Sequence, residues 1–250
     1  MAGLFSFWWR KKGKETASPS ARPIGPPRTE RAACPYCGVI IEPRPERSRK
    51  CPECGNKIIV RTRYSDRIKL LLTEEQTAQF DRERKVQAKR NDCMRRSGLI
   101  GYTRQAFEAK ERELGHQWNS HPQPGDVFWA MANQRVIDCL EKGDWHNAAM
   151  AYFQQALYLH DEGKPFFHLL QEATRADLRR YATTPIAGPK SKVRILTSKG
   201  QSCPSCQKNE GKVFTIEQAL RTMPIPNPSC TNLGTGWCRC LWVLEIEVSD

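Results

Sequence analysis

The sequence predicts a mostly α-helical chain with two small β-containing modules, one near each end. All 11 cysteines except Cys93 and Cys139 fall in two clusters. Apolar residues between the clusters recur with helical spacing. Hydrophobic residues make up 39% of the chain, enough for a helical core but not for a chain folded throughout. We expect residues 1–30 to form a disordered basic tail with an aromatic tip. A first cysteine module is expected over residues 31–64, and a charged helical segment over residues 65–120. A helical domain is expected over residues 121–184, and a C-terminal cysteine-rich α+β module over residues 191–250.

The net charge of +13 lies almost wholly in the N-terminal half of the sequence. Residues 1–125 carry 26 Lys+Arg against 14 Asp+Glu, whereas residues 126–250 carry 14 against 13. A positive half of this kind favours an anionic partner such as a nucleic acid or a membrane surface. The alternative is a solvated basic surface with no such partner.

The N-terminal tip combines aromatic residues with three basic residues over positions 4–12. This composition is typical of weak contact with a membrane surface, and the alternative is a segment that packs on the chain itself or on a partner. The charges follow a short apolar stretch, which is the wrong order for an export signal. No apolar run approaches the roughly 18 to 20 residues of a membrane span. We therefore expect a cytoplasmic protein.

The first cysteine module contains two C-P-x-C-G units, which supply Cys34, Cys37, Cys51 and Cys54. Four thiolates in two such pairs suit a tetrahedral zinc ion, and each Gly accepts the positive φ that follows the tight turn. An odd cysteine count without an export signal argues against a disulfide framework, and a thioredoxin-like redox pair is the alternative. Over about 30 residues the module resembles the zinc ribbon family, which implies short strands at Val39–Ile41 and Lys57–Val60.

Basic side chains surround this predicted ribbon. Because phosphate neutralisation dominates nucleic-acid affinity, such a cluster could bind DNA or RNA without sequence preference. Ribbons also serve as braces for protein docking, so both interpretations stay open. The candidate nucleic-acid contacts are Arg44, Arg47, Arg49, Lys50, Lys57, Arg61 and Arg63.

A long charged helix is predicted after the ribbon. Thr73 and Gln76 fit a capping box for a helix that runs to about Arg96, with Leu70–Leu72 in its thin apolar stripe. Gly98 and Gly101 are expected to break this helix. A second helix is expected over Thr103 to Leu114, followed by a loop over residues 116–125.

Three further helices are predicted before residue 184. The apolar residues Trp129, Ala132, Val136, Ile137 and Leu140 are spaced as one helix face. Gly143 ends that helix, Asp144 caps the next, and a third covers residues 166–181. Gly143-Asp144-Trp145, followed by Ala149, Phe153, Ala156 and Leu157, resembles the second helix of a tetratricopeptide repeat. The alternative is an ordinary helical hairpin with alanines in its seam.

The last module is predicted as strand, cysteine knuckle, strand, short helix, Pro-rich loop and strand. It contains Cys203-Pro204-Ser205-Cys206, then Cys230, then Cys238-Arg239-Cys240. Over about 40 residues this pattern resembles the C-terminal module of Mu F-like phage minor head proteins, in which a His precedes the Cys-Arg-Cys ending. Here Cys230 stands nearest the place of that His. The resemblance implies a metal-braced fold and a phage or mobile-element origin.

A second zinc ion is expected in this module, so the chain would hold two. Five cysteines exceed the four that tetrahedral zinc needs. We favour Cys203, Cys206, Cys230 and Cys238 as ligands, and Cys240 lies two residues along the same strand and could substitute.

The predicted function is that of a zinc-binding adaptor or scaffold with a protein partner. The sequence contains no glycine-rich phosphate loop, no H-E-x-x-H and no G-x-S-x-G, and no small-molecule substrate is evident. The first alternative is a nucleic-acid-binding protein that uses the basic ribbon and the helix after it. A zinc-dependent nuclease or transferase is the third hypothesis.

Overall fold

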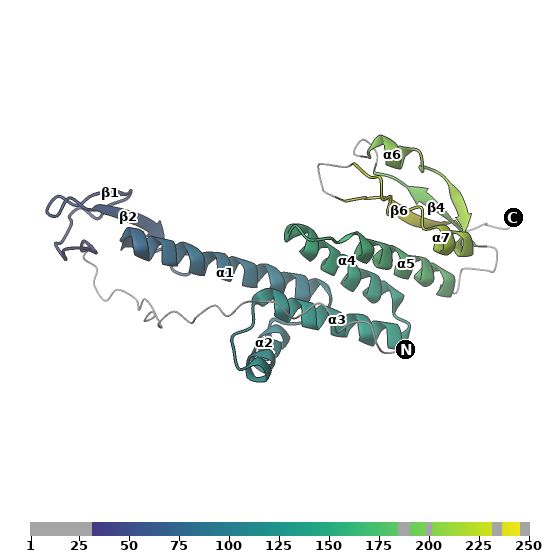
Figure 1. Cartoon of the computed structure of the whole chain (residues 1–250), viewed down its shortest axis with the longest axis horizontal. Coiled ribbons are helices and arrows are strands. Elements are labelled where there is room, and N and C mark those ends of the chain that lie inside the picture. Colours follow the sequence, from purple (N-terminus) through teal and green to yellow (C-terminus); the bar gives the residue numbers. More distant parts are fainter. Residues whose placement is uncertain (1–31, 185–190, 199–201, 232–236, 246–250) are drawn as a thin grey trace. The chain divides into compact units, whose positions relative to one another are not determined.

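The computed structural model describes residues 32–184, 191–198, 202–231 and 237–245 (Figure 1). The predicted membrane-contacting tip lies outside these residues. About half of the described residues are helical, and the strands form two three-stranded antiparallel sheets. This agrees with a mostly α chain carrying two small β-containing modules. The chain divides into two compact units, Met1–Gln79 and Phe80–Asp250, which are described separately.

The first unit contains a sheet in the order β1 (Arg49–Lys50), β2 (Lys57–Thr62), β3 (Lys69–Leu72). The predicted strand at β2 is present, whereas Val39–Ile41 forms only an isolated bridge between Ala33 and Ile40. The expectation that Leu70–Leu72 belongs to the long helix is wrong. These leucines pair with β2, and Leu70 and Leu72 are buried. Three consecutive apolar residues suit a strand covered on both faces.

Helix α1 (Glu74–Leu99) begins at the predicted capping box. The Gln76 N–H donates to Thr73 Oγ1 at 3.1 Å, and the Thr73 N–H donates to Gln76 Oε1 at 3.0 Å. The helix continues past Gly98 to Leu99, so Gly98 does not break it. The chain turns at Gly101, the second predicted break, where φ is +92°. A positive φ is the conformation that glycine tolerates best.

Four helices follow in the second unit: α2 (Arg104–Trp118), α3 (Pro124–Lys142), α4 (Trp145–Asp161) and α5 (Phe167–Thr183). Helices α3, α4 and α5 lie side by side in Figure 1, joined by short turns. Gly143 ends α3 with φ +67°, and Asp144 accepts a hydrogen bond from the Asn147 N–H at 3.2 Å, as the sequence predicts.

The apolar face predicted for α3 agrees only in part with the observed one, since Ala132 and Val136 are buried as expected but other positions differ. Ile137 and Leu140 are 49% and 38% exposed, whereas Val127, Phe128 and Met131 are buried. The spacing of apolar residues in the sequence indicates which positions share a helix face. The packing of the neighbouring helices decides which face is buried. The described core around α2 and α3 is Cys93, Ile100, Phe107, Leu114, Val127, Phe128, Met131, Ala132, Val136, Ala151 and Tyr158.

The C-terminal module follows the predicted element order. It consists of β4 (Lys192–Leu196), α6 (Pro204–Gln207), β5 (Val213–Thr215), α7 (Ile216–Thr222) and β6 (Leu241–Glu245), with sheet order β5-β4-β6. Its apolar side packs on α5, where the Tyr181 hydroxyl donates to the Trp242 carbonyl oxygen at 3.0 Å. The shared core consists of Leu178, Val193, Ile195, Ala219, Ile225 and Trp242. This contact holds the module against the helices.

Membrane-spanning character is absent from the helices that the structure describes. None of them is both long enough and apolar enough to cross a bilayer.

Candidate metal centres

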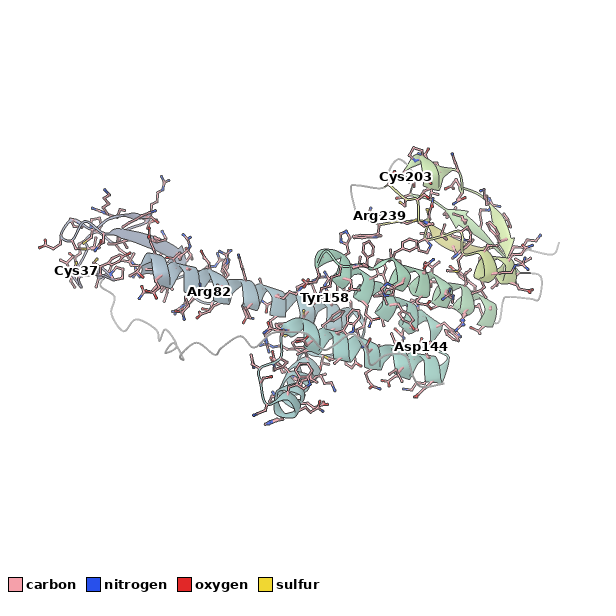
Figure 2. The ribbon with its side chains drawn as sticks, viewed as in Figure 1. Cys37, Arg82, Asp144, Tyr158, Cys203 and Arg239 are labelled. Carbon is pink, nitrogen blue, oxygen red and sulfur yellow. The ribbon has the colours of Figure 1, made fainter. Side chains whose placement is uncertain are left out.

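The N-terminal centre is formed by the two predicted knuckles (Cys37 is labelled in Figure 2). The Sγ atoms of its four cysteines, Cys34, Cys37, Cys51 and Cys54, all lie within 4.8 Å of one another. Each knuckle closes with a backbone hydrogen bond: the Gly38 N–H donates to the Cys34 carbonyl at 2.9 Å, and the Gly55 N–H to the Cys51 carbonyl at 3.0 Å. Gly38 and Gly55 have φ of +77° and +70°, so these turns need glycine.

The sulfur spacing in this centre fits tetrahedral zinc. Cys34 Sγ lies 3.8 Å from Cys54 Sγ, and Cys37 Sγ lies 3.7 Å from Cys51 Sγ. Zinc–sulfur bonds of about 2.3 Å give a tetrahedron whose edge is about 3.8 Å. A disulfide requires about 2.05 Å between sulfurs, and all four cysteines are free thiols. These four residues could therefore hold a zinc ion.

The C-terminal centre brings all five predicted cysteines together, in two overlapping groups. Cys203, Cys206 and Cys230 form one group, and Cys206, Cys238 and Cys240 form the other, with sulfurs within 4.8 Å in each. The Cys203–Cys230 and Cys206–Cys238 sulfur distances are 3.8 and 3.7 Å. These two distances again match the edge of a zinc–thiolate tetrahedron. The centre can thus hold zinc, and Cys206 belongs to both groups.

Backbone N–H groups point at two of these sulfurs. The Thr231 N–H donates to Cys203 Sγ at 3.4 Å, and the Asn227 N–H donates to Cys238 Sγ at 3.3 Å. The bond from Thr231 is the main reason that the pKa of Cys203 falls to about 6. Such donors around a metal site orient its ligands and stabilise the thiolate form that binds metal.

Cys238 and Cys240 differ in how readily they ionise. Hydrogen bonds from the Cys240 thiol and from the Asn227 N–H lower the pKa of Cys238, although burial opposes this effect. The same thiol–thiol bond raises the pKa of Cys240, and burial adds to that rise. The geometry favours Cys238 over Cys240 as the fourth ligand, because Cys238 Sγ lies 3.7 Å from Cys206 Sγ and accepts a hydrogen bond from the Asn227 N–H.

The basic residues of the ribbon are not equally available. Arg63 pairs with Asp66, and Arg44 donates to the Lys69 carbonyl oxygen. Arg61, which is partly buried, contacts the neighbouring backbone. In residues 32–79, no described carboxylate pairs with the four exposed cations that remain, which are Arg47, Arg49, Lys50 and Lys57.

Two of these cations are cross-strand neighbours. In the β1–β2 pair, Lys50 lies directly opposite Lys57, and Arg49 lies opposite Ile58. Like charges that face each other across an antiparallel pair repel and weaken it. This part of the ribbon therefore has an unbalanced positive charge that an anion could neutralise.

A pocket of about 600 Å³ lies between α4 and α5 on one side and the C-terminal module on the other. Its polar lining includes Asp177 and Arg180 from α5, and its apolar lining includes Phe153 and Trp242. Cys238 and Cys240 also line it, so the pocket adjoins the C-terminal centre. The sequence did not indicate this site, because its walls come from several segments spread between His146 and Trp242.

Trp237 connects the helices to the cysteine cluster. The His160 ring packs edge-on against the rings of Trp237 and Phe166, with distances between ring centroids of 5.1 Å and 5.0 Å. Trp237 directly precedes Cys238 in the sequence, and Arg239, which is labelled in Figure 2, directly follows Cys238. His160 thus packs against Trp237, which lines the pocket. The nitrogens of His160 do not belong to any of the three groups of candidate metal-ligand atoms in the described residues.

No family model, no curated protein and no solved structure matches this chain. The resemblances to phage minor head proteins and to tetratricopeptide repeats therefore have no support from these comparisons. The cysteine clusters themselves suggest two zinc-binding modules.

Proposed function

We propose that the chain is a zinc-braced adaptor that binds a protein partner where α4 and α5 meet the C-terminal module. The observation that carries this proposal is the pocket of about 600 Å³, a volume in the range of about 300 to 1,000 Å³ that small-ligand sites have, which can accept a side chain or short segment of a protein partner. Its aromatic and charged walls combine apolar contact with a few orienting polar groups, as binding pockets do.

Zinc has a structural role in this proposal. Sets made only of thiolates are closed and typical of structural zinc, whereas catalytic zinc keeps an open position. An ion at the C-terminal centre would join the Cys203 knuckle to Cys230 and to Cys238, which leads into β6. Because Cys238 and Trp242 line the pocket, the ion would fix one of its walls.

A capture experiment with matched cysteine variants tests this function. The full chain is used as bait in nuclease-treated lysate, and captured proteins are identified by mass spectrometry. Cys206→Ser should lose the specific partners, because Cys206 belongs to both sulfur groups of the C-terminal centre. Cys37→Ser should keep them, because it disturbs only the N-terminal ribbon. Partners that survive Cys206→Ser, or that vanish with nuclease alone, would contradict the proposal.

Nucleic-acid binding by the ribbon is the second candidate function, and the Lys50–Lys57 pair favours it. Binding would rest on phosphate neutralisation, so affinity would fall steeply as salt rises. The probe is a short DNA duplex, titrated at several salt concentrations. Lys50→Gln with Lys57→Gln should reduce the salt slope by about 2, since each lost contact removes about 0.9.

The matched control for that titration is Arg63→Gln, because Arg63 already pairs with Asp66. This variant should leave the salt slope nearly unchanged. An equal effect of both changes would show only a general loss of charge, and would remove the argument for the Lys50–Lys57 pair.

A further inference from the structure

We propose that the pocket between α5 and the C-terminal module takes a carboxylate that a partner peptide carries beside an aromatic side chain. Arg180 and Trp242 are the donors for that carboxylate. This inference rests on the proposed adaptor function and names the chemistry that the pocket selects.

Arg180 provides the cation. Its Nε is buried without a hydrogen-bond partner among the described residues, and the nearest carboxylate oxygen, Asp177 Oδ1, is 3.4 Å away. That separation exceeds the usual hydrogen-bond length of about 2.9 Å. The side chain as a whole is 39% exposed, and its guanidinium carbon lies 4.7 Å from the centroid of the Tyr181 ring. A planar guanidinium of this kind binds a carboxylate through two parallel hydrogen bonds.

Asp177 is the carboxylate partner of Arg180 in the pocket lining, at 3.4 Å from its Nε. Burial raises the pKa of the Asp177 carboxyl, although the nearby Arg180 lowers it. His146 also faces this carboxyl and lines the pocket, and Arg239 adds a second cation to the lining. The charged groups of the pocket thus favour an anionic ligand over a cationic one.

Trp242 provides a second, independent indication of a missing acceptor. The side chain is 4% exposed, and its Nε1–H has no acceptor in the described part of the chain. A buried indole N–H normally has a partner, so this one calls for an explanation. Trp242 and Arg180 line the same pocket, and each has a buried nitrogen without a hydrogen-bond partner in the described part of the chain. In the proposed complex, the two oxygens of the ligand carboxylate accept from these two residues.

The rest of the lining selects an aromatic or large apolar group. Ala149 and Ala173 leave room on the helical side, and Phe153 and Trp237 provide aromatic walls. Aromatic pairs in offset or edge-on arrangements add to the energy of area burial. The His160 ring packs edge-on against the Trp237 ring, with 5.1 Å between ring centroids, and this contact holds the Trp237 side of the pocket in place. A carboxylate with an adjacent aromatic ring fits both parts of the pocket.

The test uses the zinc-loaded, ¹⁵N-labelled full chain and two small probes of nearly equal size. N-acetylphenylalanine carries the carboxylate, and N-acetylphenylalaninamide lacks its charge. The Trp242 indole N–H resonance, identified by its loss in Trp242→Phe, should shift and saturate with the acid. The amide should bind at least tenfold more weakly. A third probe, N-acetyl-aspartyl-phenylalaninamide, distinguishes a side-chain carboxylate from a chain terminus.

Arg180→Gln should reduce the affinity for the acid to that for the amide. The matched control is Arg179→Gln, which changes the neighbouring residue on α5. The Arg179 guanidinium lies 4.8 Å from the Trp145 ring centroid, and Arg179 does not line the pocket. This control should keep the preference for the acid. Equal binding of acid and amide by the unchanged chain, or no shift of the Trp242 resonance, would overturn the inference without needing any variant.

The outcomes also separate this inference from the adaptor function. If the acid binds as expected but nuclease-treated capture finds no protein, the adaptor function fails and the carboxylate site stands. If Arg180→Gln still captures the same partners as the unchanged chain, the carboxylate site is not the docking site, and the inference fails while the adaptor function survives.

Discussion

Cys206 Sγ and Cys238 Sγ lie 3.7 Å apart, the spacing of two ligands on one zinc ion. Cys206 also groups with Cys203 and Cys230, so it is the sulfur common to the whole C-terminal cluster. Cys238 and Cys240 both group with Cys206, and neither groups with Cys203 or Cys230, but Cys238 also accepts a hydrogen bond from the Asn227 N–H. This arrangement assigns unequal roles to the five cysteines.

The cysteine variants should therefore differ in metal binding. Cys206→Ser should abolish the C-terminal site, whereas Cys240→Ser should retain it, because Cys238 Sγ lies 3.7 Å from Cys206 Sγ and has a backbone N–H donor. Cobalt substitution measures this, since tetrahedral cobalt–thiolate sites absorb visible light in proportion to occupancy. Retention by Cys238→Ser with loss by Cys240→Ser would reverse the assignment of the fourth ligand.

Gly125 should tolerate no larger residue. A Cβ at this position would lie 1.9 Å from Tyr158 Oη and 2.9 Å from Tyr158 Cζ. Forcing atoms into a packed core costs about 1 to 3 kcal/mol, so Gly125→Ala should lower the free energy of unfolding by that amount. Denaturant unfolding measures the change.

Removing the hydroxyl should partly rescue this variant, because Tyr158→Phe deletes the closer of the two clashing atoms. The control is Gly98→Ala in α1, where the added Cβ meets nothing within 4 Å. That change should stabilise the helix by up to about 1 kcal/mol. Similar losses at Gly98 and Gly125 would contradict the close approach of Tyr158.

Lys57→Glu should stabilise the ribbon at low salt. It replaces the repulsion between Lys50 and Lys57 with an attraction across the β1–β2 pair. The expected gain is roughly a few tenths of a kcal/mol, measured by thermal unfolding of the zinc-loaded chain. Adding Lys50→Glu recreates a like-charge pair and should remove the gain, and the gain should shrink in high salt. Additive effects of the two changes would mean that these side chains do not interact.

Local signals predicted much of the fold. The Thr73 and Asp144 caps, the glycine-ended knuckles and the element order of the C-terminal module all depend on residues close together in the sequence. The cysteine clusters could be found for the same reason, because each pair lies within one tight turn. Chemistry of this kind follows from residue type and spacing alone.

Features set by distant neighbours could not be predicted in this way. Leu70–Leu72 reads as apolar in either a helix or a strand, and only pairing with β2 decides between them. The exposure of Ile137 and Leu140 depends on which side of α3 its neighbours cover. The pocket joins Arg180 to Trp242 across two folded elements, so no sequence spacing could indicate it.

The zinc content of the purified full chain tests the central claim most directly. Native mass spectrometry should find two zinc ions per unchanged chain, one in Cys37→Ser and one in Cys206→Ser, because each variant disables one centre. A fully folded chain without metal, or one whose second ion persists in Cys206→Ser, would contradict the account.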